Sequence, residues 1–262
     1  MGEEKARSGT VARAIRILQV FAEANGDVSI KDLSAQTGLA PSTAHRLLHL
    51  LSEDDIIAFD PERKRYSVGP EFIRIASLVA GKTSLSDIAR PYMERVVEDA
   101  NETCVVVSYL RPRKLITVVG VVNSANPLQY ATELFATRSP LWGATGQSIV
   151  AFLPRSEQED LYDSRSTDIF PATGTKLPAK EQYLAQMDAM RVQGYALSQG
   201  QTIEGAVAIG APVFDKTNMV IGSLCVTVPE MRFTSDIQER ILGILLPQAA
   251  ALSTALGYIA AQ

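Results

Sequence analysis

Residues 29–51, SIKDLSAQTGLAPSTAHRLLHLL, predict two short helices joined by a tight turn. Ser29 and Asp32 have the spacing of a capping box, which begins the first helix. Gly38 is placed where that helix ends, because glycine takes the left-handed conformation of a helix C-cap without strain. Pro41 suits the first turn of the second helix. The chain is therefore expected to reverse direction between two helices here.

The second of these helices is amphipathic. At about 100° per residue, four apolar side chains share one face: Ala44, Leu47, Leu48 and Leu51. The opposite face carries polar and basic side chains: Ser42, His45, Arg46 and His49. A helix of this kind has the shape that lies in the major groove of DNA. A surface helix with a solvated polar face is the plain alternative, and the helix pair alone leaves both interpretations open.

The flanking residues favour DNA binding. Residues 11–24 carry an apolar stripe at helical spacing, with Asn25 in the segment that ends the helix. Residues 56–59 and 65–68 predict a β-hairpin around a proline-containing turn. A hairpin in this position is the wing of a winged helix, whose basic tip would lie against phosphates. Residues 1–70 are therefore predicted to form a winged helix-turn-helix domain. Its expected DNA contacts are Ser42, Thr43, His45, Arg46, His49, Arg63, Lys64 and Arg65.

The rest of the chain predicts a linker and a second domain. Residues 71–83 are expected to form a linker helix and a hinge, and residues 84–262 a domain that mixes helices and strands. Pro91 is expected to break or restart the first helix of that domain. A clear hairpin near the C-terminal end indicates an antiparallel sheet, and thus an α+β fold.

Composition limits the class of protein. The chain has 262 residues, a net charge of −4 and 46% apolar residues, which is a globular profile. The whole net charge falls on residues 83–262, because residues 1–82 hold equal numbers of basic and acidic side chains. The sequence has neither an apolar run long enough to span a membrane nor a signal-peptide core, so we expect a cytoplasmic protein. Cys104 and Cys225 lie in apolar runs and are expected to be buried, reduced thiols.

Neither a metal site nor a catalytic site is predicted. His45 and His49 are spaced i, i+4, but no third ligand is near them in sequence, so metal binding is not expected. The second domain has no histidine, so its Ser, Thr and Cys side chains lack an imidazole partner. The phosphate-loop spacing is also absent. We expect no cofactor.

Three parts of the sequence together resemble the IclR family of bacterial transcription regulators. They are GLAPSTAHRLLHLL (38–51), SPLWGATGQSIVAFLP (139–154), and EGAVAIGAPVFD followed by IGSLCVTVP (204–215 and 221–229). The resemblance implies a GAF-like effector domain after the winged helix, and assembly as a homodimer or a dimer of dimers. It also implies control of catabolic genes by a small ligand, often a carboxylate or an aromatic acid.

The chain departs from the family pattern near the expected ligand site. Gln147 stands where the family commonly has Lys, and Ala208 where it often has Cys. Residues 198–201, SQGQ, stand where members often carry an acidic run. The usual ligand therefore cannot be carried over to this chain.

The C-terminal hairpin is expected to form one wall of an effector site. A four-residue loop would pair Phe214 with Met219, and hence Ala208 with Cys225. Such pairing places several small side chains on one sheet face. Either a helix packs closely on that face or a ligand fills the space, and the family resemblance favours the ligand.

The second wall is expected at a helix start near Thr145. Its unpaired N–H groups suit a carboxylate, although a plain glycine-containing helix start would look the same. Leu141 and Trp142, just before it, would cap the site or simply pack. The predicted effector-binding residues are Leu141, Trp142, Thr145, Gly146, Ser198, Ala206, Ala208, Cys225 and Thr227.

These features together predict a ligand-responsive regulator, most often a repressor in such families, that binds double-stranded operator DNA. The alternative is a small-molecule enzyme or carrier built on a GAF-like domain, with the N-terminal part serving only for dimerisation.

Overall fold

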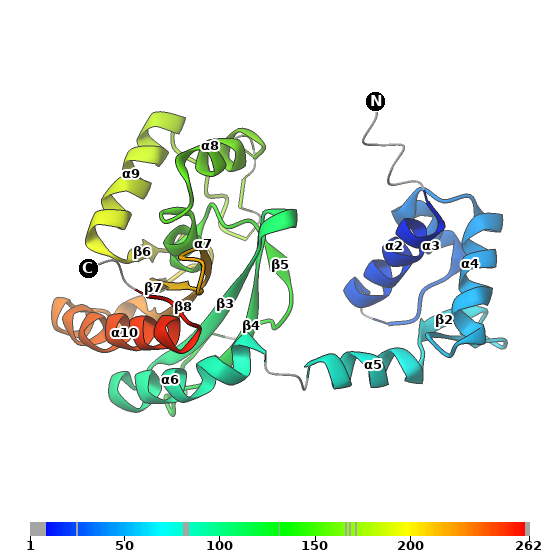
Figure 1. The fold of residues 1–262 in the computed structure, drawn as a ribbon, viewed down its shortest axis with the longest axis horizontal. Helices are drawn as coiled ribbons and strands as arrows, with labels where there is room; N and C mark the ends of the chain where they lie inside the picture. Colours follow the sequence, from blue (N-terminus) through cyan, green and yellow to red (C-terminus); the bar gives the residue numbers. More distant parts are fainter. Residues whose placement is uncertain are drawn as a thin grey trace. The chain divides into compact units, whose positions relative to one another are not determined.

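The chain divides into two compact units, residues 1–82 and residues 83–262 (Figure 1). The computed structural model describes residues 9–24, 26–80, 84–130, 132–165, 167, 169–170 and 172–259. Asn25 and the predicted hinge at residues 81–83 lie outside the described residues. No helix within these described ranges is both long enough and apolar enough to cross a lipid bilayer.

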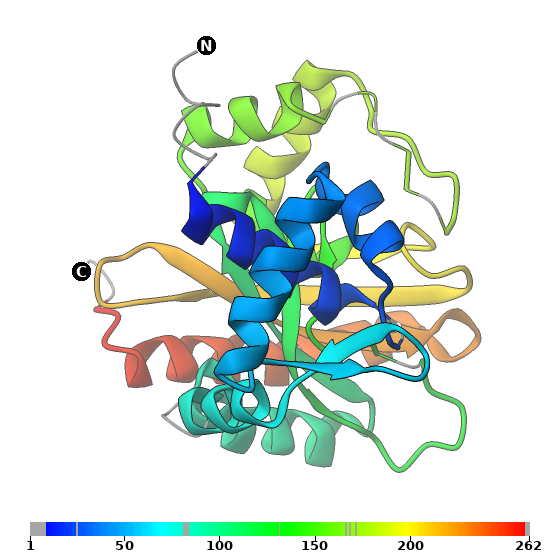
Figure 2. The same ribbon diagram turned by 90° about the vertical axis from the view of Figure 1, so that its right-hand side faces the viewer.

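The N-terminal unit is a winged helix-turn-helix, with the helices followed by a hairpin (Figure 2). Ser29 Oγ accepts the N–H of Asp32 at 3.2 Å, so the predicted N-cap is confirmed. Gly38 has φ +70° and donates its N–H to the Ser34 carbonyl at 2.9 Å, as predicted for a C-cap. The elements are α2 (Thr10–Glu23), α3 (Ile30–Thr37), α4 (Pro41–Glu53), β1 (Ile57–Asp60), β2 (Arg65–Val68) and α5 (Pro70–Ala80).

Helix α4 is held by its apolar face. Ala44, Leu47 and Leu48 are buried against side chains of α2 and α3, including Ile17 and Leu33. Burial of each large aliphatic side chain contributes about 1.5–3 kcal/mol, so this face fixes the rotation of α4. The opposite face remains exposed, as the helical phase predicts.

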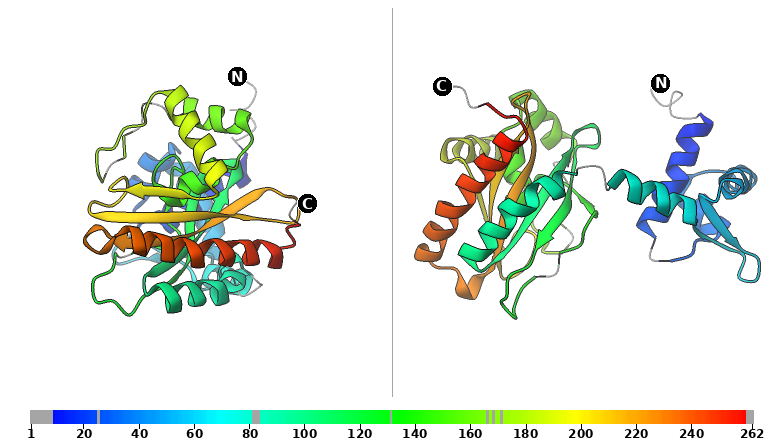
Figure 3. Two further views of the ribbon diagram at one scale, coloured as in Figure 1. Left: turned by 90° about the vertical axis from the view of Figure 1, so that its left-hand side faces the viewer. Right: turned by 60° about the horizontal axis from the view of Figure 1, so that its bottom comes forward.

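The C-terminal unit is a six-stranded antiparallel sheet covered by helices on both faces (Figures 1 and 3). The strand order is β5-β4-β3-β8-β7-β6. The strands are β3 (Thr103–Leu110), β4 (Leu115–Val122), β5 (Thr137–Arg138), β6 (Ala196–Gln199), β7 (Ala206–Phe214) and β8 (Val220–Pro229). Helices α6 (Leu85–Ala100) and α10 (Ser235–Ala255) cover one face; α7 (Gly143–Val150), α8 (Arg155–Asp163) and α9 (Lys180–Gln193) lie on the other. The short 3-10 helices η1 (Arg111–Arg113) and η2 (Glu230–Arg232) follow β3 and β8.

Two hydrophobic cores lie on the two faces of this sheet. Val106 and Leu224 pack towards α6 and α10, whereas Val107 and Cys225 pack towards α7. Cys104 and Cys225 are both buried free thiols on opposite faces, as predicted for reduced cysteines. Burial raises the pKa of the Cys104 thiol, and raises that of Cys225 to about 12. Both thiols are therefore unreactive at neutral pH.

The predicted break at Pro91 is wrong, because α6 continues through it. Proline cannot supply the amide hydrogen that would bond to the carbonyl of Asp87, and both residues lie on the exposed side of the helix. Water can therefore satisfy that carbonyl. The apolar face of α6, including Met93 and Val96, is buried on the sheet and holds the helix together across the proline.

The predicted register of the C-terminal hairpin is wrong by two residues. Ala208 pairs with Thr227 rather than Cys225, and Gly210 pairs with Cys225. Asp215 Oδ1 accepts the N–H groups of Thr217 and Met219, which makes the loop longer than predicted, and an irregularity near Phe214 adds a further shift. The Thr217 hydroxyl also donates to Asp215 and lowers the pKa of that carboxyl. A slip of two residues keeps every side chain on its predicted face.

Candidate nucleic-acid interface and ligand cavity

The outer face of α4 gathers most of the predicted DNA contacts. Ser42, His45, Arg46 and His49 are exposed on it, and Thr43 is half-buried beside them. The side chain of Arg46 has no hydrogen-bonding or ion-pair partner among the described residues. This face therefore offers one unpaired guanidinium and two imidazoles, the donor types that read base edges in the major groove.

The wing between β1 and β2 has a well-defined turn. Asp60 Oδ1 accepts the N–H groups of Glu62 and Arg63 at 2.9 and 3.0 Å, and Lys64 adopts a left-handed conformation. Arg65 donates to the carbonyl of Asp27 at 2.9 Å, so its guanidinium is tethered to the body of the unit. The other two basic side chains stand exposed at the tip, and only Arg63 has an acidic neighbour there, Asp60 at 3.9 Å.

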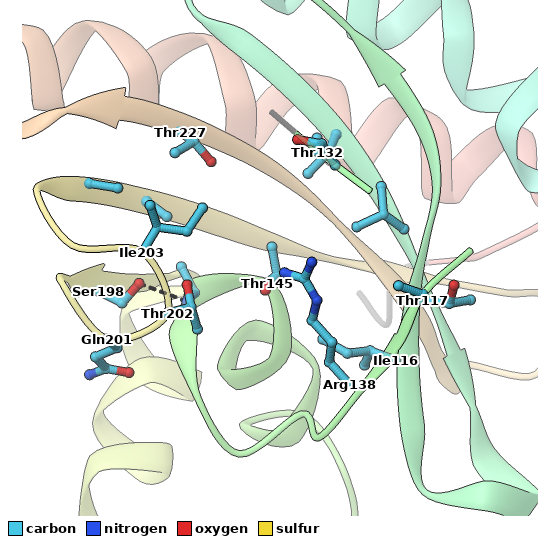
Figure 4. A pocket seen from close by; sticks show the side chains of 16 residues that line it. Ile116, Thr117, Thr132, Arg138, Thr145, Ser198, Gln201, Thr202, Ile203 and Thr227 are labelled. Atoms are coloured by element: carbon cyan, nitrogen blue, oxygen red, sulfur yellow. Dashed lines mark hydrogen bonds between the residues drawn. The ribbon is translucent and has the colours of Figure 1, made fainter. Parts of the chain in front are cut away.

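A cavity lies between the sheet of the C-terminal unit and the start of α7 (Figure 4). Its volume is about 70 Å³. The predicted residues Thr145, Ser198, Ala206, Ala208 and Thr227 line it. The remaining lining residues are Val105, Ile116, Thr117, Val118, Thr132, Ala136, Arg138, Ala144, Gln201, Thr202 and Ile203. A larger, more open pocket of about 680 Å³ shares Arg138, Thr202 and Ile203 with the cavity and extends to Trp142 and Phe170.

Four predicted effector residues do not line this cavity. Leu141 and Trp142 are buried in the core, with Trp142 also bordering the larger pocket. Gly146 lies against the Pro140 carbonyl, where an added Cβ would come within 2.2 Å of the oxygen. Cys225 pairs with Gly210 because of the register shift, which moves it away from the cavity and into the core.

The small-residue face of the C-terminal hairpin meets both a closely packed helix and a cavity, the two alternatives that the sequence left open. Helix α7 packs on one part of it, since a Cβ on Gly210 would lie 2.5 Å from the Ala144 carbonyl. Ser223 Oγ donates to the Thr145 carbonyl at 2.9 Å and fixes the helix there. The cavity occupies the adjoining part of the face, over Ala206 and Ala208.

Two of the N–H groups predicted to be free at the start of α7 are already bonded. Gly143 donates to Gln201 Oε1 at 2.9 Å, and Ala144 donates to Ser198 Oγ at 2.8 Å. The N–H of Thr145 has no acceptor among the described residues. Ser198 and Gln201 therefore act as neutral caps for a helix that they do not belong to.

An ion pair holds the loop that walls the cavity. Arg232 donates two hydrogen bonds to the carboxylate of Glu102, at 2.9 and 2.8 Å, and others to the carbonyl of Leu128. Tyr130 on the same loop donates to the Gly205 carbonyl at 2.6 Å. These bonds anchor the loop at Leu128 and Tyr130, shortly before Thr132, which lines the cavity.

The comparisons with known proteins agree with this architecture. The model of the "Bacterial transcriptional regulator IclR C-terminal" domain matches residues 78–254, and that of the "IclR helix-turn-helix domain" matches residues 10–61. The chain belongs to the IclR family. The HTH-type transcriptional regulator KipR of Bacillus subtilis is 27% identical over 253 residues, covering 96% of this chain and 98% of KipR. XynR of Escherichia coli is 26% identical over 251 residues, covering 95% of this chain and 97% of XynR.

Solved IclR structures share the fold. The IclR regulator of Alicyclobacillus acidocaldarius superposes with a TM-score of 0.81 at 23% identity, covering 95% of this chain and 98% of its own. An IclR homolog from Microbacterium hydrocarbonoxydans, complexed with 4-hydroxybenzoate, gives 0.77 at 18% identity, covering 95% and 99%. The predicted α+β fold is confirmed. Because the relatives of this IclR chain are named as transcriptional regulators, it belongs to a family of regulators rather than enzymes.

The sequence missed part of the cavity lining. Arg138 lies on the two-residue strand β5, which is too short to show a period-two pattern. Thr202 and Ile203 lie in a loop without a motif. The sequence did single out Gln201, because it lies in the segment 198–201 that departs from the family pattern. Its role as a cap of α7 could not be predicted without knowing the fold.

Proposed function

We propose that this IclR-family chain is a repressor of a catabolic operon that acts in the cytoplasm and responds to a small carboxylate or aromatic acid. Residues 1–70 bind a palindromic operator, residues 71–83 link the domains, and residues 84–262 bind the effector. The observation that carries the DNA-binding part is the exposed polar face of α4, whose leucines are buried behind it. Arg46 and His45 then read bases, while Ser42, Thr43 and the wing contact phosphates.

The cavity supports the effector part of the proposal. It combines an apolar floor with several threonine hydroxyl groups, the mixture that holds small polar metabolites. The adjoining pocket gives room for an aromatic body beside it. The Microbacterium homolog bound to 4-hydroxybenzoate shows a related protein in complex with an aromatic acid, which favours this ligand class here. No observation on the described residues favours the enzyme or carrier alternative.

A homodimer, or a dimer of such dimers, completes the proposal, and α2 and α5 supply its contact surface. Large apolar side chains on these helices are exposed, among them Val11 at 73% and Leu78 at 55%. An exposed apolar surface of this kind marks an interaction site. Paired winged helices also match the two halves of a palindromic operator.

We therefore expect sedimentation to give at least a dimer at micromolar concentration. Ile15→Glu and Ile73→Glu, on α2 and α5, each place a charge in the proposed contact and should lower the dimer fraction. Val192→Glu, on the exposed side of α9, adds the same charge elsewhere and should leave the dimer unchanged. A monomer in the presence and absence of DNA would rule out the proposed assembly.

Replacing Ala208 by leucine tests the cavity as the effector site. The larger side chain projects from the cavity wall into open space, so the effector response should be lost while the free energy of unfolding changes by less than about 1 kcal/mol. Ala211→Leu is the matched control, because Ala211 is fully buried on the α6–α10 side and should destabilise the protein by about 1–3 kcal/mol. Chemical unfolding and effector-dependent DNA release measure the two effects. An Ala208→Leu variant that is destabilised yet still responds would place the effector elsewhere.

A further inference from the structure

We propose that Arg138 is the residue that binds the carboxylate of the effector, so that the cavity selects acids carrying a single negative charge. This inference rests on the proposed effector function of the cavity and specifies the ligand class and the side chain that recognises it. It differs from the expectation drawn from the sequence, in which the start of α7 supplies the anion contact.

The charge of the cavity depends on one side chain. Arg138 is the only charged residue among the described residues that line it; the others are apolar, hydroxyl-bearing or amide side chains. The guanidinium of Arg138 also has no hydrogen-bonding or ion-pair partner among the described residues. Figure 4 shows its side chain extending from β5 towards Thr145. Arg138 is exposed at the edge of a cavity lined by hydroxyl-bearing and apolar side chains. An unpaired guanidinium in this position is matched by a carboxylate, which it can bind with two parallel hydrogen bonds.

The backbone before β5 is arranged to direct Arg138 to the cavity. Arg138 pairs with Ile116 of β4, and with a period of two Ala136 and Arg138 both line the cavity. Phe135, just before them, has φ +65°, an unfavourable left-handed conformation for a bulky residue. Its N–H donates to the carbonyl of Val118 at 2.9 Å, which ties this turn to β4. Strain of this kind persists where the surrounding structure holds a functional geometry.

The opposite wall offers no charged partner for the carboxylate. Ser198 and Gln201 already accept the first two N–H groups of α7, and they do so without adding charge. Acidic side chains at these positions would have neutralised both the helix start and Arg138. Here the cavity keeps one positive charge, and the Thr145 hydroxyl and N–H remain for an uncharged polar end of the ligand. A second carboxylate on the ligand would be left without a cation, which disfavours dicarboxylates.

The test compares acids with their uncharged amides. The probe ligands are 4-hydroxybenzoate, benzoate, pyruvate and lactate, and each is compared with its amide. Succinate serves as the dicarboxylate. Calorimetric titration of the full chain gives each affinity. We expect at least one monocarboxylate to bind the wild type at least tenfold more tightly than its amide or succinate. Arg138→Gln should weaken binding of that acid about ten- to a hundredfold, because a charge-assisted hydrogen bond is lost, and should nearly abolish the acid–amide difference. Arg138→Lys should retain part of the affinity, since it keeps the charge but loses the planar fork.

Arg113→Gln is the matched control. Arg113 is exposed on η1 and does not line the cavity, so its replacement removes the same charge and should leave acid binding unchanged. Three results would each overturn the assignment. The wild type could bind acid and amide equally, every acid could fail to bind, or the Arg138→Gln variant could bind the acid as tightly as the wild type. DNA binding without ligand is measured in parallel. If the wild type does not bind DNA, the proposed regulator function is overturned. If the wild type binds DNA but binds acids and amides equally, only the role of Arg138 is overturned.

Discussion

Replacing Arg46 by alanine should weaken operator binding about 5- to 150-fold, equivalent to about 1–3 kcal/mol, and should relax the preference for the operator sequence. The reason is the position of Arg46 on the exposed face of α4, where its guanidinium has no partner among the described residues and is free to bond a guanine edge. Fluorescence anisotropy with operator and scrambled duplexes measures both effects.

The control for this prediction is Arg113→Ala, which removes the same charge from the other unit and should change DNA affinity little. If Arg46→Ala lost affinity equally for operator and scrambled DNA, Arg46 would contact phosphate rather than bases. Retention of both affinity and selectivity would show that another face of the unit reads the operator.

Replacing Arg232 by methionine should lower the free energy of unfolding of the effector unit by about 3 kcal/mol, because it leaves a buried carboxylate without its cation. Glu102 is only 6% exposed, and both of its oxygens accept hydrogen bonds from Arg232. The Leu128 carbonyl loses its donor at the same time, so the loop that walls the cavity should also loosen. Denaturant unfolding measures the stability change.

Two controls sharpen this test. Arg90→Met removes a cation from an exposed i, i+4 pair with Glu94 and should cost less than about 0.5 kcal/mol. Combining Arg232→Met with Glu102→Gln removes both charges and should recover part of the lost stability. A loss below about 1 kcal/mol for Arg232→Met alone would mean that water replaces the guanidinium.

Local signals in the sequence were sufficient for the N-terminal unit. The cap at Ser29, the left-handed stop at Gly38 and the buried leucines of α4 each depend on residues within one helical turn of each other, and all three are confirmed. Alternation along the C-terminal hairpin likewise gave the correct face for Ala208. Its register was missed, because the hydrogen bonds made by the Asp215 carboxylate set the loop length and composition alone does not reveal them.

The chemistry of the cavity depends on contacts between distant parts of the chain. Ser198 caps the N–H of Ala144 across 54 residues, so the sequence could not show that this donor is occupied. Arg138 becomes a lining residue only because β5 pairs with β4. Helix α6 continues through Pro91 because burial on the sheet supplies more stability than the missing backbone bond removes. In each case tertiary packing decided what a local pattern left open.

The coupling of DNA binding to an acid ligand within one chain is measured most directly by the affinity of the full chain for the DNA that it selects from a random pool. We predict enrichment of a palindrome, an affinity that falls steeply as salt rises, and a change of about 5- to 150-fold when the acid that binds best in calorimetry is added. Failure to enrich any sequence, or an affinity for the selected DNA that the bound acid leaves unchanged, would contradict this coupling.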